Sequence, residues 1–351
     1  MRYIPTSKLA PGMALGQDIY DGAGRLLLAK HLLLSAEYIS NLEFLGFPGI
    51  YIDDEFTRGI EIQQILTPQV RSQALKLIHD LFSFDTTSME LPVSEVKLRM
   101  TVESVMEDVL NNGDVMCNVL DIKDYDDYIY YHSVNVCVMS IMVGAWHGTL
   151  SREQLYQLAV AAILHDIGKK FLDADVVNGE WPLQGEAREK WKMHPKLGCE
   201  FLRSSFNFPS VVYMSVLMHH EWFDGSGYPL GRARDEIPLF ARIIKMTDCY
   251  DSLTAKHPSK ENMAPSDALE YLMAMAGAQF DPQIVNIFLR KMAVYPIGCE
   301  VELSNGQRAV VAENFRDFSL RPLVRVIESG EMINLRDDPA GRSITIGRMI
   351  M

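Results

Sequence analysis

Residues 158–170 read LAVAAILHDIGKK, an apolar run that ends in a histidine, an aspartate and a glycine. The apolar run predicts a buried helix, and Gly168 allows the chain to bend directly after it. A lone histidine at such a helix end would usually be a packed core residue. Burying an adjacent aspartate is costly, however, unless a metal ion or another partner satisfies it. Because imidazole plus carboxylate is a common ligand set for divalent metals, His165 and Asp166 predict a metal site on a helical fold.

A second apolar helix, VVYMSVLMHH at 211–220, ends in two consecutive histidines. Neighbouring positions on a helix diverge by about 100°, so the two rings cannot share one face. At a helix end, both rings can nevertheless turn toward a common cluster of ions. Packing explains one buried histidine more easily than two, and we therefore interpret His219 and His220 as metal ligands.

The loop EWFDGSGYPLG follows these histidines at 221–231. Gly225 and Gly227 permit backbone torsions that are closed to other residues, and Pro229 fixes the exit of the turn. We expect this loop to wrap the rim of the site. Two roles remain open for it, a turn that only shapes the rim and a direct contact with the substrate.

Three further side chains between residues 132 and 251 are of metal-binding type. His132 lies in YIYYHSVNVCVMS, a helix whose apolar side would face the core. His194 precedes Pro195 in KMHPKLG, at the start of a helix whose first turn tolerates proline. Asp248 follows the apolar run ARIIKM, and Asp251 lies three residues further, on roughly the same face. None of them indicates a metal site alone, but beside the histidines Asp248 becomes a candidate hard ligand.

The two ends of the chain differ from its middle in their pattern of apolar and turn-forming residues. Residues 1–65 contain short apolar runs and turn signals, which predict a small α+β module with one helix from about Ser35 to Leu45. Residues 294–351 form a β-rich segment. Its stretch VELSNGQRAVVAE predicts a hairpin around Asn305–Gly306, and PLVRVI at 322–327 predicts another strand.

The middle of the chain is helical throughout, so the fold class is mainly α. Apolar residues at three- and four-residue spacing predict helices over 68–82 and 94–112, within a segment 66–120 that is a connector or a dimer-forming hairpin. In residues 121–293, helix follows helix, punctuated by Gly and Pro. We predict that this last segment is the catalytic domain, because most of the histidines lie in it.

Composition limits the classes of protein to which the 351 residues can belong. The chain is 48% hydrophobic and 23% charged, as in ordinary soluble proteins. A net charge of −13 argues against binding to nucleic acid. We identify no signal peptide and no uncharged apolar stretch near the ~18 residues of a membrane helix, and so expect no membrane segment. The five cysteines are never spaced CxxC, which favours the reducing cytoplasm over disulfides or a thiolate zinc site: they are Cys117, Cys137, Cys199, Cys249 and Cys299.

Taken together, the order and spacing of these motifs resemble the HD-GYP family, a branch of the HD metallohydrolases. The likeness spans roughly residues 124 to 293 and is carried by His132, HDIGK at 165–169, HPKLG at 194–198, HHEWFDGSGYPLG at 219–231, IPLFARIIKMTDCYDSLTA at 237–255 and GAQFDPQIV at 277–285. The opening IPTSKLAPGMALGQDIYD at 4–21 also resembles an amino-terminal module that precedes some HD-GYP domains.

The resemblance implies an HD-type helical bundle with two divalent metal ions per chain, iron or manganese. One ion would be bound by His132, His165 and Asp248, and the other by His194, His219 and His220, with Asp166 bridging both. Two cations about 3.5–4 Å apart can activate a bridging hydroxide and clamp phosphate oxygens. Seven ligands with only two carboxylates leave such a pair net positive, so that an acidic chain can bind a dianionic substrate.

The implied activity is a cyclic di-GMP phosphodiesterase, which yields linear pGpG, with further cleavage to GMP left open. Asp166 and Lys169 would be the catalytic residues, with Lys169 reaching the phosphate. The family also links the GYP loop to protein partners, and a homodimer is among the assemblies that we consider.

Two positions depart from the family pattern. Some members place a glutamate four residues before the first histidine, where it helps to bind a third ion. Here Tyr128 occupies that position, and Asp127 lies on another side of the helix, so we predict two ions rather than three. In AKHPSK at 255–260, His257 stands where the family commonly has an arginine that grips phosphate, whereas Lys260 keeps a positive charge. Imidazole lacks the bidentate fork of arginine.

Three alternatives remain. The substrate is another cyclic dinucleotide such as cyclic GMP–AMP, the chain is a general HD-type nucleotide phosphohydrolase, or it is a non-catalytic sensor or adaptor. A general phosphohydrolase would not need the DGSGYP loop, and a sensor would typically have lost ligands, whereas all seven are present.

Overall fold

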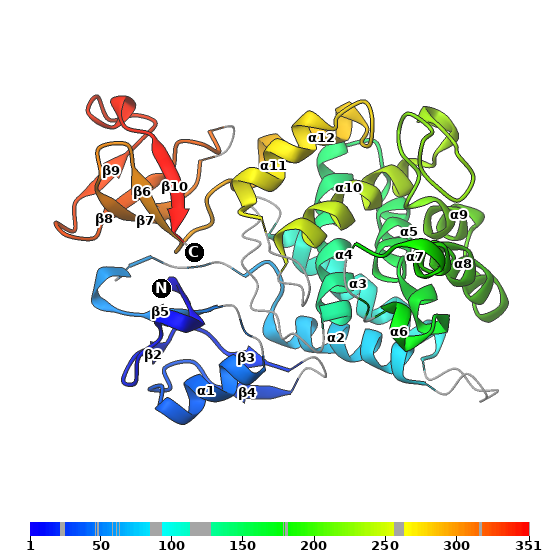
Figure 1. Ribbon diagram of the computed structural model, residues 1–351, viewed down its shortest axis with the longest axis horizontal. Coiled ribbons are helices and arrows are strands. Elements are labelled where there is room, and N and C mark those ends of the chain that lie inside the picture. The colour runs from blue at the N-terminus through cyan, green and yellow to red at the C-terminus, as the bar shows by residue number, and fades with distance from the viewer. Residues whose placement is uncertain are drawn as a thin grey trace.

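The computed structural model describes residues 1–21, 25–45, 47, 49–57, 59, 60, 62, 64–84, 93–112, 128–177, 179, 182–255, 263–315 and 318–350. Within them, a helical bundle is flanked by small sheets from the two ends of the chain (Figure 1). The mainly α fold class with small β-containing ends is therefore confirmed. The limits of the four segments proposed from the sequence stay a prediction.

The amino-terminal end forms two small sheets and one helix. A three-stranded sheet has the order β1-β5-β2, and β3 pairs with β4. Helix α1 begins after Ser35, whose hydroxyl accepts a hydrogen bond from the Tyr38 amide, in agreement with the predicted helix. The elements are β1 (Arg2–Pro5), η1 (Thr6–Lys8), β2 (Ala14–Leu15), β3 (Ile19–Tyr20), β4 (Leu26–Leu28), α1 (Ala36–Phe44), β5 (Gly49–Asp53) and η2 (Glu55–Thr57).

Two amphipathic helices lead into the bundle, as predicted. They are α2 (Pro68–Ser83) and α3 (Glu95–Asn111), and they begin after Thr67 and Ser94, whose side chains accept from backbone amides of the first turn. Both helices pack against each other and against α4 (Tyr128–His147) in the main core. They therefore support the helix that carries His132.

The bundle itself is built around α4, α5 (Arg152–Ile163) and α10 (Leu239–Thr254), which lie side by side (Figure 1). Around them are η3 (Ile167–Phe171), α6 (Ala174–Val177), α7 (Gly185–Trp191), α8 (His194–Ser205), α9 (Ser210–Met218), η4 (Arg234–Glu236), α11 (Pro265–Ala274) and α12 (Pro282–Lys291). Gly168 of η3 is needed for a close approach as well as for a bend. A Cβ there would stand 1.9 Å from the His194 carbonyl oxygen, so glycine lets the His-Asp turn meet α8.

The inference that no uncharged apolar stretch approaches the length of a membrane helix is wrong. Helix α4 has 20 residues and is apolar enough to span a membrane by length and composition. In the structure, 78% of its most apolar window is buried inside the protein. It packs against α2, α3, α5 and α10, so burial on most of its sides accounts for its apolar character.

The carboxy-terminal end is a five-stranded antiparallel sheet of order β10-β6-β7-β8-β9. The predicted hairpin is confirmed, with Gly306 at the turn at a φ of +83°. The chain just before this sheet contacts the amino-terminal sheet, where the Tyr3 amide donates to the Gly298 carbonyl over 2.8 Å. Its elements are β6 (Glu300–Leu303), β7 (Arg308–Glu313), β8 (Leu323–Val326), β9 (Met332–Asn334), η5 (Gly341–Ser343) and β10 (Ile346–Ile350).

Candidate metal centre

The bundle brings together all seven side chains that the sequence singled out as metal ligands. His132 comes from α4, His165 and Asp166 from the turn after α5, and Asp248 from within α10. His194 begins α8, and His219 and His220 follow directly after α9. Five separate stretches of chain therefore deliver ligands from the ends and faces of neighbouring helices to one place.

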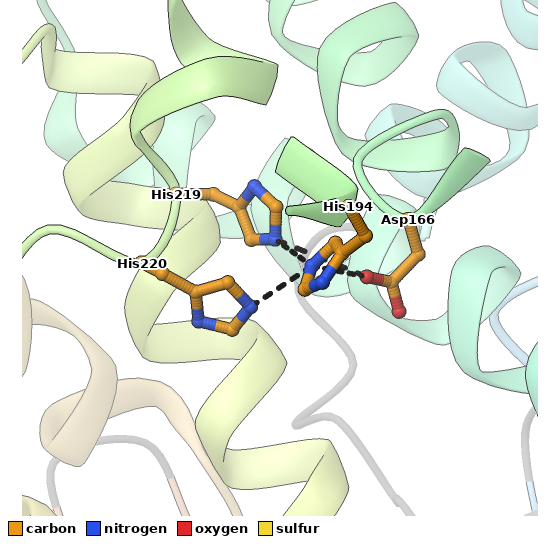
Figure 2. Close-up of side chains that lie close together, drawn as sticks. All are labelled: Asp166, His194, His219 and His220. Carbon is orange, nitrogen blue, oxygen red and sulfur yellow. Dashed lines mark hydrogen bonds and ion pairs between the residues drawn. The ribbon is translucent and has the colours of Figure 1, made fainter. Parts of the chain in front are cut away.

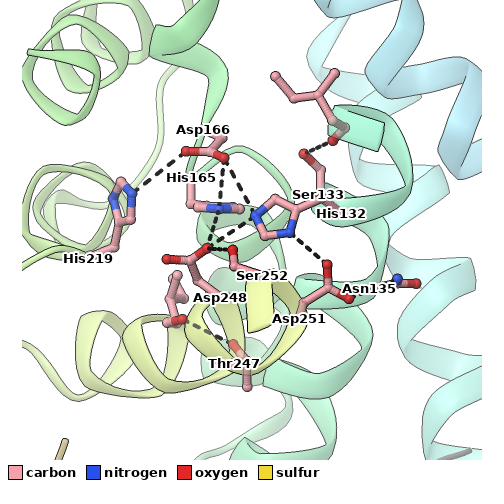
Figure 3. Close-up of polar contacts among 12 residues, drawn as sticks. His132, Ser133, Asn135, His165, Asp166, His219, Thr247, Asp248, Asp251 and Ser252 are labelled. Atoms are coloured by element: carbon pink, nitrogen blue, oxygen red, sulfur yellow. Dashed lines mark hydrogen bonds and ion pairs between the residues drawn. The ribbon is translucent and has the colours of Figure 1, made fainter. Parts of the chain in front are cut away.

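The seven side chains fall into two groups, in each of which one ligand atom per residue lies within 4.8 Å of the others. The first group is Asp166, His194, His219 and His220 (Figure 2). The second group is His132, His165 and Asp248 (Figure 3). These groups correspond to the two ligand sets that the resemblance implies.

The Asp166 carboxylate lies between the two groups. Its Oδ1 is 3.3 Å from His194 Nε2, in the first group. Its Oδ2 is 3.4 Å from His165 Nε2 and 3.6 Å from His132 Nε2, in the second (Figure 3). One carboxylate thus presents a different oxygen to each group, which is the geometry that a bridging ligand needs.

Hydrogen bonds to the backbone fix the tautomer of three of the histidines. The Nδ1 atoms of His165, His194 and His219 each donate to a carbonyl oxygen, so the lone pair of each neutral ring is on Nε2. The acceptors are Ala162 (2.8 Å), Trp191 (2.7 Å) and Val216 (2.7 Å). Each Nε2 points into the cluster. Each acceptor lies three residues before its histidine, so one turn of the local backbone is enough to orient the ring for metal binding.

The Nε2 atoms that face one another are poorly satisfied by protein alone. His194 Nε2 lies 3.3 Å from His219 Nε2 and 3.1 Å from His220 Nε2. His165 Nε2 is buried without a hydrogen-bond partner in the described part of the chain. Converging lone pairs repel, and a buried orphan acceptor is costly. A cation between these atoms would satisfy all of them, so the residues fit a metal ion.

The pKa shifts of the histidines and of Asp166 also favour metal binding. Burial lowers the pKa of His194, and burial together with the charges of neighbouring histidines lowers the pKa of His219 well below its usual range. These rings are therefore neutral, the form that binds metal. Burial would raise the pKa of Asp166, but the neighbouring His165 imidazole and Lys169 ammonium outweigh it and hold the pKa well below normal. The carboxylate is thus ionised.

Asp251 holds His132 in place, a role that was not predicted from the sequence. Its Oδ2 lies 2.8 Å from His132 Nδ1, and its Oδ1 accepts from the Asn135 side chain over 3.0 Å (Figure 3). Burial alone would lower the pKa of His132, but the hydrogen bonds to Asp248 and Asp251 raise it to about 9. The spacing of Asp248 and Asp251 on one helix face was the available signal for this contact.

Lys169 and Tyr128 both lie at the edge of the cluster. Lys169 Nζ is ion-paired with Asp166 Oδ2 and also lies 4.5 Å from the centroid of the Trp191 ring. The Tyr128 ring stacks on His132 with centroids 5.3 Å apart, and its hydroxyl is 3.4 Å from His132 Nδ1. Tyr128 therefore packs against the edge of the site. Asp127, His257 and Lys260 lie outside the described residues.

The loop after His220 is tied down by Glu221, which is 2% exposed. Its carboxylate accepts from the amides of Leu230 (2.6 Å) and Arg232 (3.1 Å), which fixes the end of the loop. Gly225 has a φ of +90°, as its predicted role requires. Gly227 has a different reason to be glycine: a Cβ there would lie 2.1 Å from the Trp222 amide nitrogen. The loop thus covers His220 in one defined shape.

Comparison with known proteins agrees with this site. Residues 141–284 match the model of the HD domain family. A cyclic di-GMP phosphodiesterase from Pseudomonas aeruginosa is 32% identical over 65% of this chain and 55% of its own length. A cyclic di-GMP phosphodiesterase response regulator from Xanthomonas campestris is 40% identical over 41% of this chain and 38% of its own length. The match to each of these relatives therefore spans little more than half of the relative at most.

One solved structure shares the fold over most of its length. It is an HD-GYP-type protein from Bdellovibrio bacteriovorus, written "HDG"Y"P" in its description, with a TM-score of 0.50 and 16% identity. The similarity covers 82% of this chain and 97% of that protein. The fold of most of this chain is therefore found in that protein as well.

Proposed function

Because the chain belongs to the HD-GYP family of HD-domain proteins, we propose that it is a metal-dependent phosphodiesterase. Its substrate is the bacterial second messenger cyclic di-GMP, which it cleaves to linear pGpG and then to GMP. The observation that carries this proposal is the buried cluster of five histidines and two aspartates, in two groups joined by Asp166.

We infer that the two groups hold two divalent cations, which would supply an activated water molecule and positive charge opposite the phosphate oxygens. The chain's own residues prepare that chemistry. Backbone carbonyls orient three of the imidazoles, and Asp251 orients a fourth. Lys169 adds a positive charge at the edge of the cluster, held by Asp166 and the Trp191 ring. That charge would stabilise a non-bridging phosphate oxygen as negative charge develops on it.

Iron or manganese is the expected metal, because the ligands are rich in histidine and contain few carboxylates. We expect two ions per chain. A third ion would need a carboxylate one helical turn before His132, and Tyr128 holds that place. Burial raises the pKa of the Tyr128 phenol well above its usual value, so it stays protonated and is a poor ligand.

Anomalous scattering from crystals of the metal-loaded protein would count the ions. Two peaks, one in each group, are the expected result. Three fully occupied peaks, with one bound by Asp127, would show that the binuclear assignment is wrong.

The function itself is tested by incubating metal-loaded protein with cyclic di-GMP, cyclic GMP–AMP and cyclic di-AMP and separating the products by chromatography. We expect cyclic di-GMP to be converted to pGpG and GMP, with loss of activity on chelation and recovery with iron or manganese. Absence of hydrolysis of every dinucleotide by fully loaded protein would contradict the proposal and favour a sensor or adaptor.

We place the protein in the reducing cytoplasm, where its substrate would be made. The four cysteines within the described residues are free thiols, and three of them are buried. The GYP loop is the surface through which we propose that protein partners bind, because it is ordered by Glu221 and lies at the rim of the cluster. A homodimer remains a proposal that sedimentation analysis would test.

A further inference from the structure

A pocket of about 670 Å³ opens beside the metal cluster, within the range of about 300–1,000 Å³ that is typical of small-molecule sites. One wall is the segment 182–192, which includes α7, and the other is the GYP loop from His220 to Tyr228. His220 joins the cluster through His194 on the side away from Asp166 (Figure 2). It is therefore the side chain that belongs to both the cluster and the pocket.

The lining of this pocket combines aromatic rings with positive charge. Trp191, Trp222 and Tyr228 supply the rings, and Arg188 and Lys192 supply the charge. Aromatic faces bind nucleobases by stacking, largely without regard to sequence. Cations next to such faces favour an electron-rich, anionic ligand.

Side chains of the metal cluster pack against the rings of the pocket. Tyr228 stacks on His220 with centroids 4.9 Å apart and an interplanar angle of 20°. The Trp222 carbonyl accepts from the Gly225 amide over 2.9 Å, within the tight turn that Gly227 permits. Trp191, from α7, lies edge-on to His194 with centroids 5.4 Å apart. Two of the three rings therefore pack against histidines of the cluster.

Arg188 is the group that can read the identity of a base. Lys192 is already paired with Glu189 at 2.7 Å. Arg188, in contrast, makes no side-chain hydrogen bond or ion pair with another residue of the described chain. A guanidinium binds the O6 and N7 atoms of guanine with two parallel hydrogen bonds, whereas adenine offers a donor at the position of O6.

We propose that this pocket is a guanine subsite, in which the aromatic rings stack on one base of the dinucleotide and Arg188 selects guanine over adenine. The inference rests on the proposed function, since it places the scissile phosphate at the cluster next to His220. It predicts that any dinucleotide with at least one guanine is accepted. Cyclic di-GMP and cyclic GMP–AMP should therefore both be good substrates, and cyclic di-AMP a poor one.

The test is the rate of hydrolysis of the three dinucleotides by wild type, Arg188→Ala and Arg188→Lys. Wild type should prefer cyclic di-GMP over cyclic di-AMP in kcat/KM by on the order of tenfold to a hundredfold, which is the discrimination of one bidentate contact. Arg188→Lys keeps the charge but loses the fork, so this preference should fall to near parity. The matched control is Lys190→Ala, on the same helix but outside the pocket lining, and it should keep the wild-type ratio.

Two results would overturn the subsite. If both Arg188 variants keep the wild-type preference, Arg188 does not read the base. If they lose activity equally on all three dinucleotides, Arg188 contacts a phosphate instead.

A binding measurement separates this inference from the proposed function. GMP and AMP are titrated into metal-loaded protein while tryptophan fluorescence is recorded, with Trp191→Phe and Trp222→Phe to assign the signal. The GMP concentration that half-quenches the tryptophan fluorescence should be on the order of tenfold lower than the corresponding AMP concentration. Arg188→Lys should make the two concentrations equal. Binding with this preference but without hydrolysis of any dinucleotide would refute the phosphodiesterase and leave the pocket. Hydrolysis of the dinucleotides without a base preference that depends on Arg188 would refute the guanine subsite and leave the phosphodiesterase.

Discussion

Replacing Asp166 with alanine should abolish hydrolysis and empty most of the metal site. This carboxylate presents one oxygen to each group of histidines, so its loss removes a ligand from both groups at once. It also leaves Lys169 and the converging imidazoles without their buried counter-charge. We expect the rate to fall by at least about 10³-fold, beyond the loss of one electrostatic stabiliser.

Metal content, measured by plasma mass spectrometry, should fall from near two ions per chain to below one. Asp166→Asn keeps the size of the side chain and removes its charge, so it should show the same loss if the fold is intact by circular dichroism. Asp173→Ala is the matched control, because that carboxylate is exposed and pairs with Lys190 at the surface. Full activity of Asp166→Ala after chelation would refute the metal centre.

Replacing Lys169 with alanine should have the second largest effect, but through a different route. The Lys169 ammonium lies on Asp166 and over the Trp191 ring, at the edge of the cluster rather than within either ligand group. As a contact to a phosphate oxygen, it should contribute about 10²-fold or more to the rate. Metal content should be unchanged, because removing a positive charge beside Asp166 relieves competition for that carboxylate.

The measurement is kcat together with metal content in the same preparation. Lys196→Ala, an exposed lysine of α8 that is 3.9 Å from Glu200, is the control and should be fully active. A collapse of metal content in Lys169→Ala would mean that Lys169 organises the ligands, and the assigned phosphate contact would be wrong.

The sequence alone determined the mainly helical fold and the seven clustered side chains. Histidine and aspartate at the ends of apolar runs are informative because burying them without a partner is expensive. Their order along the chain carried the resemblance to HD-GYP proteins. Hydrophobic periodicity likewise located α2 and α3, and the Asn305–Gly306 turn located the hairpin of β6 and β7, since local chemistry determines such elements.

Sequence periodicity could not separate a buried core helix from a membrane span. Helix α4 satisfies the length and composition of both, and only its neighbours on the other helices decide between them. The role of Asp251 was hidden for a similar reason. Its spacing from Asp248 placed it on the same helix face, but its partner His132 is 119 positions away in the chain, and no local pattern identifies that partner.

Only the tertiary structure placed Arg188 opposite the GYP loop. The two walls of the pocket come from segments about thirty residues apart. The sequence suggested a role at the site for the loop only, and none for residues 182–192. A close approach between two elements likewise explains why position 168 is a glycine. Gly168 is required because the carbonyl oxygen of His194, from the start of α8, lies 1.9 Å from where a Cβ would be. A contact of that kind depends on how helices and loops pack together, and no single stretch of sequence encodes it.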